Sequence, residues 1–239
     1  MPRPRRAASG GLVYHVLNRA NARRTIFDTK WDFRAFEDML AETQEHVPMR
    51  ILAWCVMPNH WHLVLWPQEN GQLSDYMRRL TVTHTQRWHA CRGTAGTGHL
   101  YQGRFKSFVV QHDAYFLNVC RYVEANALRA KLVARAEHWR WSSLGRACRG
   151  EANLPPRIHA WPLSRPSDWI EYVNQPPSAS DLNALRRCAQ RGAPYGNENW
   201  TEEIARQLGL ESTLRPRGRP ERPATEKVPD PFSGRSLFE

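Results

Sequence analysis

The chain has 239 residues, enough for one sizeable hydrophobic core and a smaller additional region. Arginine dominates its net charge of +11, which favours nucleic acid as the partner, and no basic amphipathic helix points to a membrane surface. The five cysteines form no Cys-x-x-Cys pair and no apolar run reaches ~18 residues, which argues against a disulfide framework, a zinc ribbon and a membrane span. We therefore expect a cytoplasmic protein with reduced thiols and without a signal peptide.

Periodicity and turn residues predict seven elements in the first 128 residues. In chain order they are a strand, a helix, two strands that form a hairpin, a helix, a strand and a further helix, over residues 12–17, 27–45, 50–56, 60–66, 73–91, 103–111 and 113–128. The first six have the ferredoxin-like order β-α-β-β-α-β. We therefore predict an α+β fold with an antiparallel sheet and helices on one face.

The composition changes after Ser143, where prolines become frequent and periodicity weakens. We predict a first domain over residues 1–147 and an accessory, mainly helical region over 148–214, with helices near 180–191 and 201–210. Residues 215–239 are rich in proline and charge and are predicted to be disordered.

The predicted tail contains an Arg-Gly-Arg-Pro sequence. Such a flat, extended segment can place the guanidinium groups of Arg217 and Arg219 in a narrow A·T minor groove. The alternative is a tail that only adds solubility, and the sequence leaves the two interpretations open.

Two histidines lie in the apolar segment that forms the third predicted strand. Because side chains alternate along a strand, His60 and His62 point to the same side, roughly 7 Å apart for a rise of ~3.4 Å per residue. Two imidazoles in this position can bind one divalent metal. The alternative is a pair of half-buried strand histidines without a metal.

A tyrosine and an asparagine follow on the predicted helix over residues 113–128. Tyr122 and Asn126 are four residues apart and therefore neighbours on one helical face. A phenol, an amide oxygen and two imidazoles can form a phosphoryl-transfer site, in which the ligands suit Mn²⁺ and, less well, Mg²⁺. Tyr115 is the rival nucleophile, and Asn126 has the alternative role of a helix cap.

Basic residues precede this helix in the fourth predicted strand. Arg104 and Lys106 are two residues apart, so we expect them to share a strand face and to contact the DNA backbone. Ordinary solvated charges are the alternative interpretation.

His60-Trp61-His62 resembles the His-hydrophobic-His motif of the HUH nucleases, and residues 57–63 are similar to the single-tyrosine transposases. Residues 121–130 resemble the tyrosine helix of these enzymes. The resemblance is strongest to the REP-associated tyrosine transposases and covers residues 10–147 and the Arg-Gly-Arg-Pro tail. Further matching features are Asn18-Arg19 with Asn21, Gln102-Gly103-Arg104-Phe105 and Trp141-Ser142-Ser143.

The resemblance implies metal-dependent cleavage and rejoining of single-stranded DNA at palindromic repeats that fold as hairpins. It implies that Tyr122 attacks the backbone and forms a 5′-phosphotyrosine, with His60 and His62 as ligands of Mg²⁺ or Mn²⁺. Asn126 stands where related insertion-sequence enzymes have a third, amide-bearing ligand. Ala127 departs from the proline usual in the subgroup, which leaves the end of the helix in doubt. The expected DNA-binding residues are Asn18, Arg19, Arg104, Lys106, Arg217 and Arg219.

Two other functions are compatible with these features. One is a hairpin DNA- or RNA-binding regulator without catalysis, and the other is a metal-dependent ribonuclease. The insertion-sequence relatives share active sites across a dimer. Here the region after residue 150 is expected to occupy that surface and to favour a monomer, bound to DNA at the nucleoid.

Overall fold

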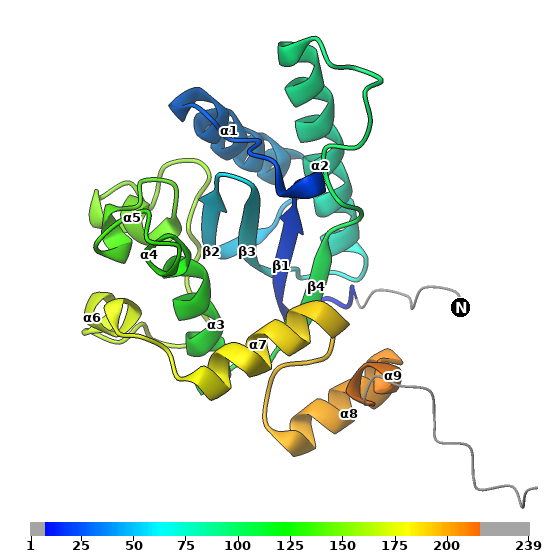
Figure 1. Cartoon of the computed structure of the whole chain (residues 1–239). Coiled ribbons are helices and arrows are strands. Elements are labelled where there is room, and N and C mark those ends of the chain that lie inside the picture. The colour runs from blue at the N-terminus through cyan, green and yellow to red at the C-terminus, as the bar shows by residue number, and fades with distance from the viewer. Residues whose placement is uncertain (1–7, 216–239) are drawn as a thin grey trace, which may run out of the picture.

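The structure, a computed structural model, describes residues 8–215 (Figure 1). Its antiparallel sheet has the strand order β2-β3-β1-β4. The strands are β1 (Val13–Arg19), β2 (Arg50–Met57), β3 (His60–Trp66) and β4 (Lys106–Val110). This is the strand order of a ferredoxin-like unit, so the predicted α+β fold with an antiparallel sheet is confirmed.

Helices α1 (Lys30–His46) and α2 (Gln72–Arg92) pack against each other and cover one face of the sheet (Figure 1). Thr29 begins α1 with a capping box: its side chain accepts from the backbone N–H of Asp32, whose carboxylate accepts from the backbone N–H of Thr29. The apolar stripes of both helices meet strand residues such as Trp54 in one core. Both helices were therefore predicted correctly, to within a few residues at each end.

A hydrogen-bonded chain within this core includes Trp61, the residue between the two strand histidines. Trp61 Nε1–H donates to the Tyr101 hydroxyl at 2.9 Å, and that hydroxyl lies 2.6 Å from Nδ1 of His84. His84 is buried and stacks on Phe27. Since the tyrosine oxygen accepts from the tryptophan, its own proton is free to go to His84, which is then a neutral acceptor.

We expect His84 to make the fold sensitive to acid. Burial, with Arg92 nearby, lowers the pKa of His84 from 6.5 to about 3. Between these values the unfolded chain binds a proton that the folded chain does not, so stability is complete above pH 6.5 and falls as the pH decreases. At pH 4.5 the cost is roughly 2–3 kcal/mol. Denaturant unfolding at pH 7 and 4.5 measures this cost.

The control variant is His84→Gln, which keeps an acceptor for Tyr101 but does not titrate. Its unfolding free energy should fall by less than that of the natural chain between the two pH values. Equal losses in both proteins would contradict the prediction.

The opposite face of the sheet is covered by α3 (Ala114–Glu124) and α4 (Asn126–Arg129). The single helix predicted over residues 113–128 is therefore two helices, separated at Ala125 with φ −81° and ψ 5°. Asp113 caps the start of α3 by accepting from the backbone N–H of Tyr115. Helix α3 lies against β2 and β3, the two strands of the hairpin.

The later part of the chain shares the core beneath α3. Its helices are α5 (Ser143–Cys148), α6 (Trp169–Asn174), α7 (Ala179–Arg191), α8 (Glu198–Leu208) and α9 (Glu211–Leu214). Trp169, Val173 and Leu185 belong to the same buried cluster as Phe116 of α3. Tyr195 extends the edge of the sheet, because its N–H donates to the carbonyl of Val109 at 2.8 Å. Figure 1 shows α7 crossing the end of the sheet beside β4.

Helices were predicted close to α7 and α8, although α8 begins at Glu198 with Asn197 as its cap and not at Thr201. The boundary between 147 and 148 stays a prediction. Arg217 and Arg219 lie outside the described residues. In the described part, none of the helices combines the length and apolar character that crossing a bilayer requires.

Candidate active site

The two histidines of β3 lie on the face of the sheet that α3 covers. Their ring centroids are 5.1 Å apart, and His62 is buried. In the sheet, His60 pairs with Arg19 of β1, and His62 pairs with Leu17 of β1 and Cys55 of β2. Trp61 between them is buried in the core on the opposite face. The shared face that the two-residue spacing predicts is therefore confirmed.

A third imidazole, from β1, completes the cluster. His15 is buried, and its Nε2 lies 2.9 Å from Nδ1 of His62, with the two rings nearly parallel. Nδ1 of His15 is also buried and has no hydrogen-bond partner. Phe108 packs edge to face against the same ring, with 4.9 Å between centroids. His15 was not predicted as a site residue.

Tyr122 of α3 lies directly over these imidazoles. Its ring centroid is 5.7 Å from that of His62 and 6.0 Å from that of His15, edge to face in both cases. Within the described residues the Tyr122 hydroxyl makes no hydrogen bond. The phenol is therefore available to an incoming group, beside the paired histidines.

The helix that carries Tyr122 is fixed by buried polar contacts on its other side. Glu124 is fully buried and accepts from the Ser143 hydroxyl at 2.6 Å and from Trp169 Nε1–H at 2.7 Å. Arg121 donates to the carbonyl of Gln175 at 2.7 Å. These contacts join α3 to α5 and α6, so the later part of the chain sets the position of the tyrosine.

Arg129 stacks on the ring of Tyr122. Its Cζ lies 3.9 Å from the centroid of the Tyr122 ring, and its Nη1 donates to the Tyr122 carbonyl at 2.6 Å. Arg129 is the last residue of α4, beyond the break at Ala125 that separates α4 from the helix of Tyr122. Its charge, together with that of Arg19, acts on the histidine cluster.

The imidazoles are neutral at physiological pH. Burial first, and the charges of Arg19 and Arg129 second, lower the pKa of His60 to about 4. Burial and Arg129 lower the pKa of His15 to about 3, and burial holds the pKa of His62 well below 6.5. Neutral imidazole is the form that binds metal ions, because it keeps a lone pair.

The donor set fits a divalent cation. Hydrogen bonds occupy Nδ1 of His60 and Nδ1 of His62, while no hydrogen bond in the described part engages either Nε2. Residues 8–215 contain no group of three His, Cys, Asp or Glu side chains arranged to hold a metal. Two Nε2 atoms would therefore be joined by an amide, water or phosphate oxygen, a mixed set that suits Mn²⁺ better than Mg²⁺.

Asn126, the third predicted ligand, begins α4 and is buried. Its Nδ2 is one of the buried polar atoms without a hydrogen-bond partner. The break at Ala125 separates it from the helix of Tyr122, so the spacing of four residues does not lie within one regular helix. Its role as a ligand stays a prediction.

The predicted DNA-binding residues have different positions. Arg19 lies on β1 and pairs with His60, whereas the exposed Lys106 lies on the edge strand β4 and pairs with Leu17 of β1. Arg104 is exposed but precedes β4, so it does not share a strand face with Lys106 as predicted. The strand begins late because residues 102–104 form a bend, in which Gln102 N–H donates to the carbonyl of Arg19.

Asn18 points away from the histidines. It pairs with Trp61, and its side chain is buried between the backbone of Gly103, to which Nδ2 donates at 3.4 Å, and the N–H of Arg19. This side chain fixes the loop beside Arg19 and is not presented to a ligand.

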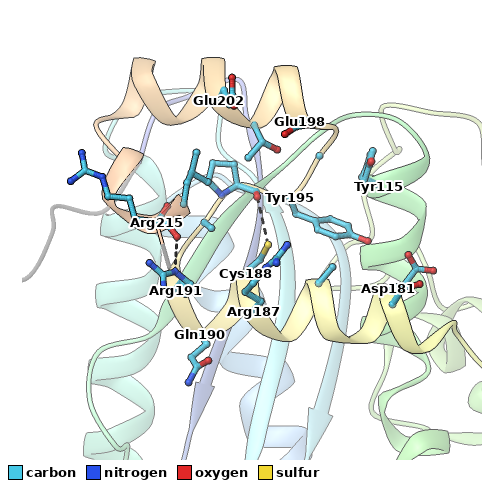
Figure 2. Close-up of a pocket in the computed structure, with 18 residues that line it drawn as sticks. Tyr115, Asp181, Arg187, Cys188, Gln190, Arg191, Tyr195, Glu198, Glu202 and Arg215 are labelled. Atoms are coloured by element: carbon cyan, nitrogen blue, oxygen red, sulfur yellow. Dashed lines mark hydrogen bonds between the residues drawn. The ribbon is translucent and has the colours of Figure 1, made fainter. Parts of the chain in front are cut away.

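The rival nucleophile, Tyr115, is turned to a different surface. Its ring packs against Tyr195 at 5.1 Å, and it lines a cavity of about 790 Å³ between α7 and α8. Figure 2 shows Tyr115 and Tyr195 on one side of this cavity, with Arg191 and Arg215 on the other. None of the strand histidines lines it.

A family model described as "Transposase IS200 like" matches residues 8–126, and the chain belongs to this family. The match contains all of the histidine cluster and Tyr122, whereas Arg129 and helices α5 to α9 follow it.

Two curated relatives are similar over part of the chain. The REP-associated tyrosine transposase of Escherichia coli (strain K12) is 23% identical over 137 residues, which are 57% of this chain and 78% of that protein. A putative REP-associated tyrosine transposase of Haemophilus influenzae is 25% identical over 126 residues, 48% of this chain and 70% of that protein.

A solved REP-associated tyrosine transposase bound to a REP hairpin has the same fold. The TM-score is 0.52 at 18% sequence identity, over 68% of this chain and 96% of that chain.

Proposed function

We propose that this transposase cleaves and rejoins single-stranded DNA beside palindromic repeat hairpins, with Tyr122 as the nucleophile. The observation that carries the proposal is the convergence of the Tyr122 ring on His62 and His15, at 5.7 and 6.0 Å between centroids. A phenol next to neutral imidazoles and an arginine is a site for phosphoryl transfer.

The proposed reaction exchanges one ester of phosphate for another. The phenol oxygen of Tyr122 attacks phosphorus, and the bond from phosphorus to the 3′ oxygen breaks. The phenol loses its proton, and the 3′ oxygen leaves as a hydroxyl after taking one up. The product is a 5′-phosphotyrosine, from which another 3′-hydroxyl can reverse the reaction, so no external energy source is needed.

His60 and His62 would hold Mg²⁺ or Mn²⁺ through Nε2, with the Asn126 amide oxygen as a candidate third ligand. When bound, the cation polarises the scissile phosphate. Arg129 would contact the same phosphate beside the phenol, because its guanidinium stacks on the Tyr122 ring.

The DNA partner is inferred from charge and from the relatives. Arg19 lies on β1, Lys106 on the edge strand β4 and Arg104 just before β4, so they are candidates for contacts to phosphates. The solved relative is bound to a REP hairpin, and we propose the same class of substrate here. Arg217 and Arg219, outside the described residues, remain candidates for the minor groove. We propose a monomer, because α5 and α6 hold the tyrosine helix through contacts within one chain.

The metal dependence is tested with hairpin oligonucleotides that carry single-stranded flanks and a label at the 3′ end. With Mn²⁺ or Mg²⁺ we expect a labelled protein–DNA adduct on a denaturing gel, which EDTA removes and added Mn²⁺ restores. Removing a residue that hydrogen-bonds to a metal ligand typically lowers activity by roughly 10–100-fold. His62→Ala removes a proposed ligand itself, so the rate of adduct formation should fall by more than this.

Three outcomes would contradict parts of the proposal. An adduct that persists in EDTA would exclude the metal. Tight hairpin binding without any covalent product would favour a regulator that has lost catalysis. Cleavage of the matching RNA hairpin, with none of the DNA, would favour a ribonuclease.

A further inference from the structure

We infer that Asn59 and His15 are positioning residues: each accepts the Nδ1 proton of one strand histidine, so that the Nε2 lone pairs of His60 and His62 face a cation. The inference rests on the proposed metal function. It concerns the ring protons, which can be observed without metal, DNA or cleavage.

Asn59 lies in the turn between β2 and β3. Its Nδ2 lies 3.1 Å from the carbonyl oxygen of Arg23, and its Oδ1 lies 2.6 Å from Nδ1 of His60. A carbonyl oxygen only accepts hydrogen bonds, so the amide nitrogen must face Arg23 and the amide oxygen must face His60. The orientation of the Asn59 amide is thereby fixed from its far side.

The ring proton of His60 follows from this orientation. The amide oxygen of Asn59 has no proton to donate, so Nδ1 of His60 must carry one. A neutral imidazole has a single N–H, and its Nε2 therefore keeps the lone pair. This arrangement, with the second ring nitrogen donating to an oxygen, is the usual one for histidines that bind metals.

The carbonyl that fixes Asn59 belongs to an unusual loop. Ala22 and Arg23 have φ values of 53° and 56°, in the left-handed region that residues with a side chain rarely adopt. The backbone of the hairpin turn also holds this loop, because the Asn59 carbonyl accepts from Ala20 at 2.9 Å and the Pro58 carbonyl from Ile26 at 2.8 Å. The loop is thus built around the turn that carries Asn59.

Nε2 of His15 and Nδ1 of His62 are 2.9 Å apart and share one proton in their hydrogen bond. If His62 donates it, Nε2 of His62 is free, and the buried Nδ1 of His15 carries a proton. If His15 donates it, Nε2 of His62 is protonated and cannot bind a cation. Since only the first arrangement leaves a ligand at His62, we assign His15 as the acceptor.

The ring protons can be read from a long-range ¹H–¹⁵N spectrum of the full chain, labelled at histidine and free of metal and DNA. Peaks are assigned from the single variants. We expect His60 and His62 to be protonated at Nδ1 and not at Nε2. A proton on Nε2 of His60 would overturn the assignment of Asn59, and one on Nε2 of His62 would overturn that of His15.

Metal affinity gives an independent measurement, by titration of Mn²⁺ alone into the full chain with the free-ion EPR signal as readout. Asn59→Ala and His15→Phe remove the acceptors, and each should weaken binding by about 10–100-fold. His15→Gln restores an acceptor oxygen and should recover most of the affinity. Thermal unfolding by circular dichroism controls for the fold of each variant.

The outcomes separate this inference from the proposed function. Unchanged affinity in folded Asn59→Ala and His15→Phe would overturn the role of the two acceptors. If the natural chain binds no Mn²⁺ at all, the proposed metal function fails, whereas the spectrum still decides where the protons lie. Equal losses in His15→Phe and His15→Gln would show a structural role only and would also overturn the inference.

Discussion

Tyr122→Phe is expected to abolish the covalent protein–DNA adduct while the protein still folds and binds hairpin DNA. The substitution removes one oxygen, and loss of a nucleophile typically costs on the order of a thousand-fold or more in rate. The hydroxyl makes no hydrogen bond in the described part of the chain, so its removal should leave the melting temperature almost unchanged. Adduct on a denaturing gel, hairpin affinity and thermal unfolding measure the three quantities.

The matched control is Tyr115→Phe, which removes the same oxygen from the same helix. Tyr115 packs on Tyr195 and lines the cavity beside α7, away from the histidines. We therefore expect its adduct to form at nearly the natural rate. An adduct that still forms in Tyr122→Phe but not in Tyr115→Phe would identify Tyr115 as the nucleophile and exclude Tyr122.

The sequence predicts much of the fold because its signals are local. The alternation of β3 places His60 and His62 on one face, and the register with Arg19 and Cys55 keeps them there. The apolar spacing of α1 and α2 likewise decides which sides of these helices are buried.

The other site residues come together through contacts between segments that are distant in the sequence, which no local pattern predicts. His15 meets His62 across 47 residues of sequence, through the register of β1 and β3. Its only local signal is the alternation that puts it on the same face as Leu17 and Arg19. Arg129 reaches the Tyr122 ring across the break at Ala125, so no regular helical spacing indicates this contact either.

The region after residue 148 was predicted as accessory because its prolines interrupt periodicity. In the structure, short helices supply single large residues to the core under α3, as Trp169 does by donating to Glu124. Isolated contacts of this kind leave no periodic pattern, although they determine where the tyrosine helix lies.

Arg129→Gln is expected to lower the rate of adduct formation by about 10²–10³-fold, the usual effect of removing one fixed donor from a reacting oxyanion. The guanidinium lies 3.9 Å from the Tyr122 ring and is anchored by one nitrogen to the Tyr122 carbonyl. Its other N–H groups are then available to the phosphate that the phenol attacks. Single-turnover cleavage of a hairpin oligonucleotide measures the rate.

The planar guanidinium of arginine and the ammonium of lysine are not equivalent at such a site. Arg129→Lys keeps the positive charge but cannot both stack on the ring and donate in parallel, so we expect it to recover only part of the rate. Hairpin affinity should change by only a few-fold in either variant, because one contact among many phosphates carries a small share of binding.

Arg186→Gln provides the control, since Arg186 is an exposed arginine of α7 close enough for its charge to act on Arg129. It removes the same charge without a contact to Tyr122. It should therefore weaken hairpin binding slightly, while the rate of adduct formation at saturating DNA equals that of the natural chain. If Arg129→Gln and Arg186→Gln slow the reaction equally, Arg129 contributes only to the general positive field. A selective loss at Arg129, with unchanged thermal unfolding, would place its guanidinium on the reacting phosphate.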